Sequence, residues 1–269
     1  LSSSASISNE GNDYTATYVV QSGDSEGTVT FTVAFEDATG NSGVQVSAVT
    51  DGSSVTFDET APTLSSVGIA SDNSNTAYSK VGDEITLSFT SSETLGSTPT
   101  VTIDGNAASV SNTGNDYTAT YTSQSGDTED VQGFTIDFTD TSSNAGTQVT
   151  AVTDGSSVTF DENPPTILAE IVTAAEIDES IPVKATITDA GSGIDTATIM
   201  LNFAIDGVDQ NALLMTANGE DDTFSATIPS QSSAVTITYY VTADDNVGNS
   251  GRDPSTTHSI DVQEFVLTL

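Results

Sequence analysis

Acidic side chains recur at matching positions along this 269-residue chain, and their spacing is its main chemical signal. Three loops carry an aspartate followed four residues later by an asparagine: Asp37 and Asn41, Asp140 and Asn144, Asp245 and Asn249. Acid pairs precede two proline-containing segments, and further acids follow predicted strands: Asp58 and Glu59, Asp161 and Glu162, then Glu93, Asp189 and Asp195. Several carboxylate and amide oxygens from separate loops suit Ca²⁺, whereas Mg²⁺ takes fewer protein ligands.

The elements that must position these acids are repeated units. Residues 11–18 recur as residues 114–121, and residues 48–59 recur without a mismatch as residues 151–162. Both pairs share an offset of 103 residues. A period of about 100 residues is the size of a whole β-sandwich domain, far longer than a solenoid repeat. The chain is therefore a tandem array.

The sequence pattern inside each unit is that of β-strands. Residues 85–89, 117–121 and 134–138 alternate apolar with small polar side chains, and turn residues separate such runs. Residues 181–187, 196–203, 213–215, 224–228 and 235–241 are the predicted strands of a more divergent last unit. We expect an all-β protein of tandem Ig-like β-sandwiches in an elongated array. Its predicted units are residues 1–60, 61–162 and 163–269.

The first predicted unit contains only part of a repeat. Leu1 aligns with Asp104, so the sequence has no counterpart of residues 61–103 ahead of it. Half a sandwich would leave one core face bare. Two explanations stay open: upstream sequence supplies the remaining strands, or a partner chain supplies them by strand addition. Copies of the same chain and neighbouring repeats of a longer chain are both candidate partners.

Sandwich topology predicts that the acids meet at the junctions between units. The loop after the second strand and the loop before the last strand lie at the end where the chain enters a unit. We therefore predict two Ca²⁺ sites. The first would use Asp58, Glu59, Glu93, Asp140 and Asn144. The second would use Asp161, Glu162, Asp189, Asp195, Asp245 and Asn249.

Two weaker interpretations accompany the calcium prediction. Asp, Asn and Gly are also ordinary turn residues in solvated loops. The acids of residues 22–26 and 127–130 lie at the opposite ends of their units. We expect those to face solvent, although they could instead approach the following linker.

Composition excludes several functions. The 39 Asp and Glu against 3 Lys and Arg give a formal charge of -36. Nucleic acids and anionic membrane surfaces are therefore excluded as partners, since both require basic clusters. No apolar run approaches the 18 residues of a membrane span, and cysteine is absent. His258 is the single histidine, and no catalytic motif is present, so we expect no enzyme.

Several short motifs carry a resemblance. They are residues 37–41 (Asp-Ala-Thr-Gly-Asn), 58–62 (Asp-Glu-Thr-Ala-Pro), 80–83 (Lys-Val-Gly-Asp) and 89–93 (Phe-Thr-Ser-Ser-Glu). With them, residues 1–165 resemble the bacterial Ig-like tandem repeats of large cell-surface adhesins. Residues 239–249 of the last unit resemble the final strand pair of fibronectin-type and Ig-like modules. The resemblance implies an extracellular, cell-surface extender that calcium stiffens.

The expected function is accordingly a non-catalytic extender array of a prokaryotic surface adhesin. Near-identical repeats favour such a stalk, because a unique binding pocket would not need duplication. One alternative is a self-assembling surface-layer or filament subunit, which the incomplete first unit and open strand edges would serve. Another is a ligand-binding module in the divergent last unit.

Overall fold

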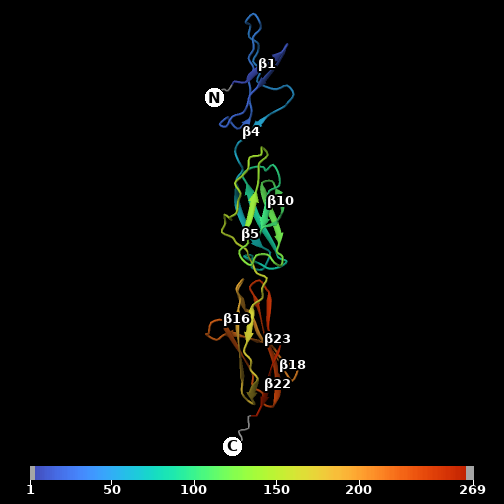
Figure 1. The fold of residues 1–269 in the computed structure, drawn as a ribbon, viewed down its shortest axis with the longest axis vertical. Helices are drawn as coiled ribbons and strands as arrows, with labels where there is room; N and C mark the ends of the chain where they lie inside the picture. Colours follow the sequence, from blue (N-terminus) through green and yellow to red (C-terminus); the bar gives the residue numbers. More distant parts are fainter. Residues whose placement is uncertain (1–3, 265–269) are drawn as a thin grey trace.

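The molecule is a row of three all-β units placed end to end (Figure 1). The structure is a computed structural model that describes residues 4–264. Between those residues every regular element is a strand. We refer to residues 4–60, 61–162 and 163–264 as the first, second and third units. Residues 1–3 and 265–269 of the predicted outer units lie outside the described residues.

The second unit consists of two antiparallel sheets. One has the order β10 (Ser109–Thr113), β11 (Asp116–Thr122), β7 (Glu84–Ser91) and β5 (Leu64–Ser71). The other has the order β12 (Phe134–Asp137), β8 (Thr100–Ile103) and β9 (Asn106–Ala107). The short strands β6 (Tyr78–Ser79) and β13 (Thr159–Phe160) pair in parallel at the margin. The six main strands in chain order are β5, β7, β8, β10, β11 and β12. The first, second, fifth and fourth of them form one sheet, and the third lies beside the sixth in the other. This is the immunoglobulin arrangement.

The alternating pattern of the second unit produces its core. Along β7 the inward residues Ile85, Leu87 and Phe89 are buried, while the residues between them are more exposed. Residues of the facing sheet, such as Ile103 and Ile136, complete one apolar cluster. Burying each such side chain contributes about 1.5–3 kcal/mol, so this core stabilises the unit.

The third unit repeats the same plan with longer strands. One sheet has the order β14 (Thr166–Ala169), β16 (Ile181–Thr188), β21 (Thr223–Ile228) and β20 (Thr216–Ala217). The other has the order β15 (Ala174–Glu176), β23 (Ser250–Gln263), β22 (Val235–Asp245), β17 (Ile194–Ile205) and β18 (Val208–Asp209), with β19 (Leu213–Leu214) paired to β17. The strands predicted for this unit are confirmed. A second, separate core cluster lies between the two sheets.

The first unit keeps the local pairings of its repeat but has no comparable core. Strands β1 (Ser6–Glu10) and β2 (Asp13–Thr17) form a hairpin in the register of β10 and β11. Strands β3 (Gly27–Thr28) and β4 (Thr56–Phe57) also pair, and an isolated bridge joins Val33 to Val46. Both core clusters of the described chain belong to the other two units. Local sequence thus specifies the hairpin even though residues 4–60 contain no counterpart of β5, β7 and β8.

Candidate metal centres at the unit junctions

Three carboxylates meet where the chain enters the third unit. Asp161 follows β13, Asp189 follows β16 and Asp245 ends β22. One oxygen of each carboxylate lies within 4.8 Å of the others. Asp161 and Asp245 are buried, and Asp189 is half-buried. The predicted convergence of linker and loop acids is therefore present at this junction.

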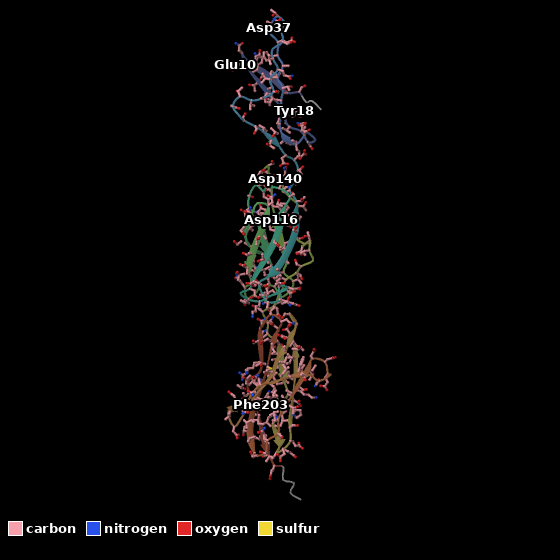
Figure 2. All side chains as sticks on the ribbon, turned by 180° about the vertical axis from the view of Figure 1, so that it is seen from behind. Glu10, Tyr18, Asp37, Asp116, Asp140 and Phe203 are labelled. Carbon is pink, nitrogen blue, oxygen red and sulfur yellow. The ribbon has the colours of Figure 1, made fainter. Side chains whose placement is uncertain are left out.

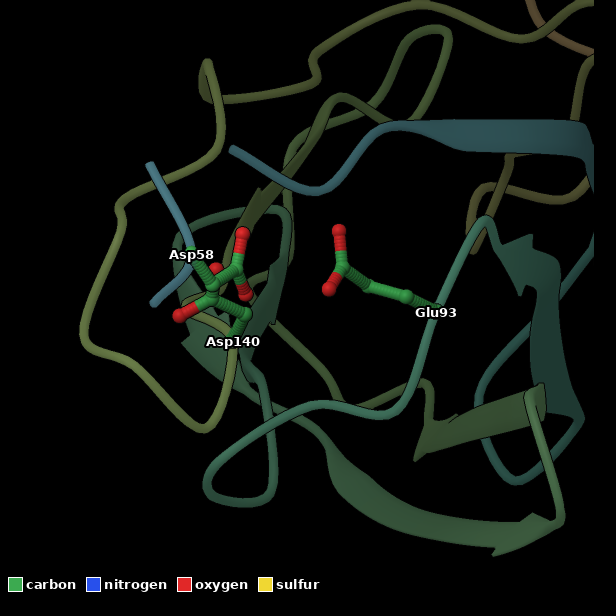
Figure 3. Close-up of side chains that lie close together, drawn as sticks. All are labelled: Asp58, Glu93 and Asp140. Carbon is green, nitrogen blue, oxygen red and sulfur yellow. The ribbon is translucent and has the colours of Figure 1, made fainter. Parts of the chain in front are cut away.

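An equivalent trio occupies the junction between the first and second units. Asp58 of the linker, Glu93 after β7 and Asp140 after β12 place one oxygen each within 4.8 Å of the others. Figure 3 shows the Asp58 and Asp140 carboxylates side by side, with Glu93 extending toward them from a separate loop. In Figure 2, Asp140 lies at the end of the second unit that faces the first. The two trios come from corresponding places in two units of different sequence.

The asparagines of the repeated loop hold the trios together. Asn249 Nδ2 donates to Asp245 Oδ2 at 2.7 Å and to the Asp161 backbone carbonyl at 3.0 Å. Asn144 Nδ2 makes the same two contacts, to Asp140 Oδ2 at 2.8 Å and to the Asp58 carbonyl at 3.1 Å. Each asparagine therefore ties the linker backbone to the loop aspartate. The predicted asparagines lie at the sites with their amide nitrogens turned toward the acid.

Three of the predicted acidic ligands lie outside the trios. Glu59 points back to the first unit, where Ser22 Oγ donates to its carboxylate at 2.5 Å. Asp195 accepts from the backbone N–H of Ala197 at 3.0 Å, within the first turn of chain in β17. Glu162 follows the buried Asp161 but contributes no oxygen to the trio. The structure therefore brings together one linker acid at each junction, where two were expected.

Each preceding unit also sends an acid to the linker, which is the less favoured alternative that the sequence left open for residues 22–26 and 127–130. The backbone N–H of Glu162 donates to Glu129 Oε1 at 3.0 Å, and Asn163 Nδ2 donates to the same oxygen at 2.7 Å. Glu26 accepts in the same way from the Glu59 N–H at 2.9 Å. The expectation that these acids face only solvent is wrong, because they anchor the linker. Their equivalence under the 103-residue offset, amid differing neighbours, was the available signal.

Close packing around Asp161 leaves no room for a larger residue in the adjoining loop. A Cβ added to Gly191 would collide with the Asp161 carboxylate. The next residue, Ser192, donates its backbone N–H to Asp161 Oδ2 at 2.6 Å. An open recess of about 530 Å³ adjoins this site, and Glu129 and Asp189 are among its lining residues. Of the trio, Asp189 is the member that lines this recess.

Basic side chains do not balance these acids. Within residues 4–264 the only ion pair joins Lys184 to Glu220 at 3.7 Å, on the third unit and outside both trios. Burial raises the pKa of Glu93, and the charges of Asp58 and Asp140 raise it further. Burial likewise raises the pKa of Asp245, with a further contribution from Asp161. Two carboxylates about 4 Å apart repel by roughly 4 kcal/mol at an effective dielectric constant of 20.

The arrangement can bind a divalent cation through oxygen atoms. Three carboxylates from separate loops, with water completing the shell, suit the flexible coordination of Ca²⁺. His258, the single histidine, packs against the Tyr239 ring of the third unit with 5.2 Å between ring centroids. It is paired with Tyr239 across β22 and β23, away from both trios.

Comparisons with known proteins add little to this description. No family model and no curated protein matches the chain. Two solved marsupial T cell receptor chains are similar in structure. One is 8% identical, with a TM-score of 0.43, and the match covers 76% of this chain and 75% of the receptor chain. The other is 10% identical, with a TM-score of 0.27 and coverages of 77% and 75%.

These scores carry no argument about function, and the Ig-like assignment rests on the strand order of the second and third units. The fold class is all-β, as expected. In the part of the chain that the structure describes, no helix has the length and apolar character of a membrane span.

Proposed function

We propose that this chain is a non-catalytic extender array outside a prokaryotic cell, in which Ca²⁺ at each junction fixes the angle between neighbouring units. The observation that carries the proposal is the equivalence of the two carboxylate trios. Each takes one acid from the linker, one from the loop after the second main strand and one from the loop near the last strand. A cation bound there would tie the linker to two loops of the following unit.

The energetics of the trios favour a bound cation. Without one, each junction gathers carboxylates that have no basic partner within the described residues. With Ca²⁺ the interaction becomes attractive, and free ion at about 100 times its dissociation constant adds roughly 2.7 kcal/mol to the stability of the folded state. Extracellular modules typically have dissociation constants of about 10⁻⁴–10⁻³ M. Free calcium at about 10 times the dissociation constant would add roughly 1.4 kcal/mol.

The elongated shape supports a spacing role. The three units lie in a row (Figure 1), and short linkers join β4 to β5 and β13 to β14. Glu26 and Glu129 anchor each linker to the unit before it. A trio on the far side would then make each linker rigid on both sides. The resemblance to repeats of surface adhesins agrees with an extracellular, cell-surface location.

Calcium titration of the full chain tests the proposal. We expect two ions to bind per chain by calorimetry, and EDTA to lower Tm and increase flexibility between units in small-angle X-ray scattering. Asp161→Asn should abolish one of the two binding events. Asp209→Asn, on the exposed strand β18, is the matched control and should leave both intact. Binding of no calcium, with Tm and scattering unchanged by EDTA, would overturn the proposal.

A second candidate is a subunit of a surface layer or filament, which exposed edge strands such as β18 favour. Negative-stain microscopy of the purified chain in calcium distinguishes the two functions. Isolated rods support the extender, whereas sheets or fibres support assembly.

A further inference from the structure

A recess on the second unit is lined by uncharged residues only. It has a volume of about 360 Å³ and lies between the loop that follows β7 and the turn between β10 and β11. Sites for small molecules have volumes of about 300–1,000 Å³. The lining residues are Thr94, Leu95, Ser97, Thr98, Asn112, Gly114, Asn115 and Tyr117. In a chain with 39 acidic residues, this composition distinguishes the recess from the junctions.

The loop wall of the recess is held against a neighbouring segment. Leu95 forms an isolated bridge with Asp140, and the Gly96 N–H donates to the Thr139 carbonyl at 2.9 Å. A Cβ added to Gly96 would collide with the Asp140 carbonyl, so the loop lies directly on that segment. Ser97 follows at once and is exposed. The hydroxyl groups of this wall are therefore presented from a fixed backbone.

The turn wall is fixed in a similar way. The Ser91 N–H at the end of β7 donates to the Asn115 carbonyl at 2.9 Å. The Tyr117 ring stacks on Phe89 with 5.3 Å between ring centroids, and Tyr117 is only 6% exposed. Because both walls are formed before a ligand binds, binding requires little ordering of the chain.

The polar groups of the recess suit a ligand that both donates and accepts hydrogen bonds. Threonine and serine hydroxyls and asparagine amides can each do both. The hydroxyl groups of a saccharide have the same capacity. An anionic ligand would find no basic side chain in the recess and would be repelled by a chain of formal charge -36. A neutral, hydroxyl-rich molecule is therefore the class of ligand that fits.

The corresponding turn of the third unit has the opposite character. Between β20 and β21 it contains Glu220, Asp221 and Asp222. In the β10–β11 hairpin the only acid is Asp116, which accepts from Thr90 Oγ1 at 2.7 Å and does not line the recess. The uncharged recess is thus a property of the sequence of the second unit and does not follow from the shared fold.

We propose that this recess binds a neutral saccharide, which adds a glycan contact to the spacing role of the array. The threonine and serine hydroxyls of the loop wall would bind one side of the sugar, and the Asn112 and Asn115 amides would bind the other. None of the lining residues belongs to a carboxylate trio, so sugar binding and calcium binding can fail separately. Since the recess is small and open, we expect millimolar affinity.

NMR titration of the full chain in calcium-containing buffer tests the proposal. The probes are the neutral disaccharides maltose, cellobiose and N,N′-diacetylchitobiose, with glucuronic acid as the charged comparison. We expect at least one of the disaccharides to produce saturable amide shifts at Thr94, Ser97 and Asn115. Glucuronic acid should produce none there. The absence of a saturable shift at the recess with all three disaccharides would overturn the proposal, as would equal shifts with glucuronic acid.

Two substitutions and a matched control locate the site. Asn115→Asp keeps the size of the side chain, adds a charge and removes the amide donor, so binding should weaken roughly tenfold. Thr98→Val removes one exposed hydroxyl and should weaken binding by about two- to tenfold. Asn12→Asp should have no effect, because Asn12 lies in the same Gly-Asn-Asp-Tyr sequence but residues 4–60 have no counterpart of the loop 94–98.

The amide spectra of the variants show whether each remains folded, since shifts away from the substitution should be unchanged. Unaltered affinity in folded Asn115→Asp and Thr98→Val would overturn the proposal. A loss in Asn12→Asp equal to that in Asn115→Asp would also overturn it, because the sugar would then bind outside the recess.

Discussion

The two junctions are built from the same parts but differ in how completely they are enclosed. At the second junction Asp161 is fully buried, whereas its counterpart Asp58 at the first junction is half-buried. Two further contacts cross only the second junction: Lys80 Nζ donates to the Gly248 carbonyl at 3.0 Å, and Asn73 Nδ2 donates to the Val247 carbonyl at 3.4 Å. The donors lie before β7 in the second unit, in a region with no counterpart among residues 4–60. These two contacts add to the enclosure of the second junction.

The pKa values of the corresponding aspartates, Asp140 and Asp245, also differ between the two junctions. Burial raises the pKa of Asp140, but hydrogen bonds from the Asn144 side chain and from loop amides outweigh burial and leave it below its ordinary value. Asp245 accepts equivalent hydrogen bonds, yet burial and the charge of Asp161 keep its pKa raised. Without a metal, Asp245 therefore resists ionisation more than Asp140, and we expect the more buried second junction to gain more from a cation.

The largest expected effect comes from removing one linker acid at each junction. Asp161→Asn should weaken calcium binding by at least the roughly 10–100-fold that loss of an outer-shell partner costs. At calcium near 100 times the original dissociation constant, a 100-fold loss removes about 2 kcal/mol of stabilisation. Asp58→Asn should have a smaller effect, because Asp58 is more exposed. Calorimetry and calcium-dependent Tm measure both variants, and equal losses would contradict the ranking of the junctions.

Acidification should separate the calcium-free from the calcium-loaded protein. Raised pKa values at Asp245 and Glu129 mean that the folded state binds more protons than the unfolded state between pH 7 and the ordinary values near 4. In EDTA, the free energy of unfolding should therefore rise as pH falls from 7 toward 5. In saturating calcium it should fall, because protons compete with the ion.

Chemical denaturation at pH 7, 6 and 5 measures this slope. Asp245→Asn should flatten the calcium-free slope, and Asp209→Asn should leave it unchanged. A calcium-free protein that loses stability over this pH range would show that the trios do not resist ionisation.

The sequence was sufficient to predict the strands and loop positions that one unit determines by itself. It was not sufficient to predict contacts that depend on how two neighbouring units are placed. Alternation of apolar residues indicated the strands, and the topology of a sandwich was enough to predict that Asp189 and Asp245 lie beside the linker. Glu59 and Glu162 were expected to join the trios, but neighbouring linker residues point in different directions, and only one of each pair can face the following unit. The contact of Lys80 was not predicted, because it depends on the angle between units, which no periodicity in one unit specifies. For Glu129 the favoured prediction, solvent, was wrong, and the alternative, an approach to the linker, is what the structure has.

The smallest expected effect comes from removing a hydrogen bond that is found only at the second junction and that does not involve the trio. Lys80→Met keeps the apolar stem and removes the ammonium, so the hydrogen bond to Gly248 is lost. One such bond contributes about 0.5–1.5 kcal/mol, and calcium would hold the junction without it. We therefore expect a broader distribution of angles between the second and third units in EDTA, and little change in calcium, by residual dipolar couplings. Lys184→Met is the matched control, since Lys184 contacts Glu220 within the third unit. If Lys184→Met broadens the angles as much as Lys80→Met, the bond across the junction has no special role, and the trio alone sets the stiffness.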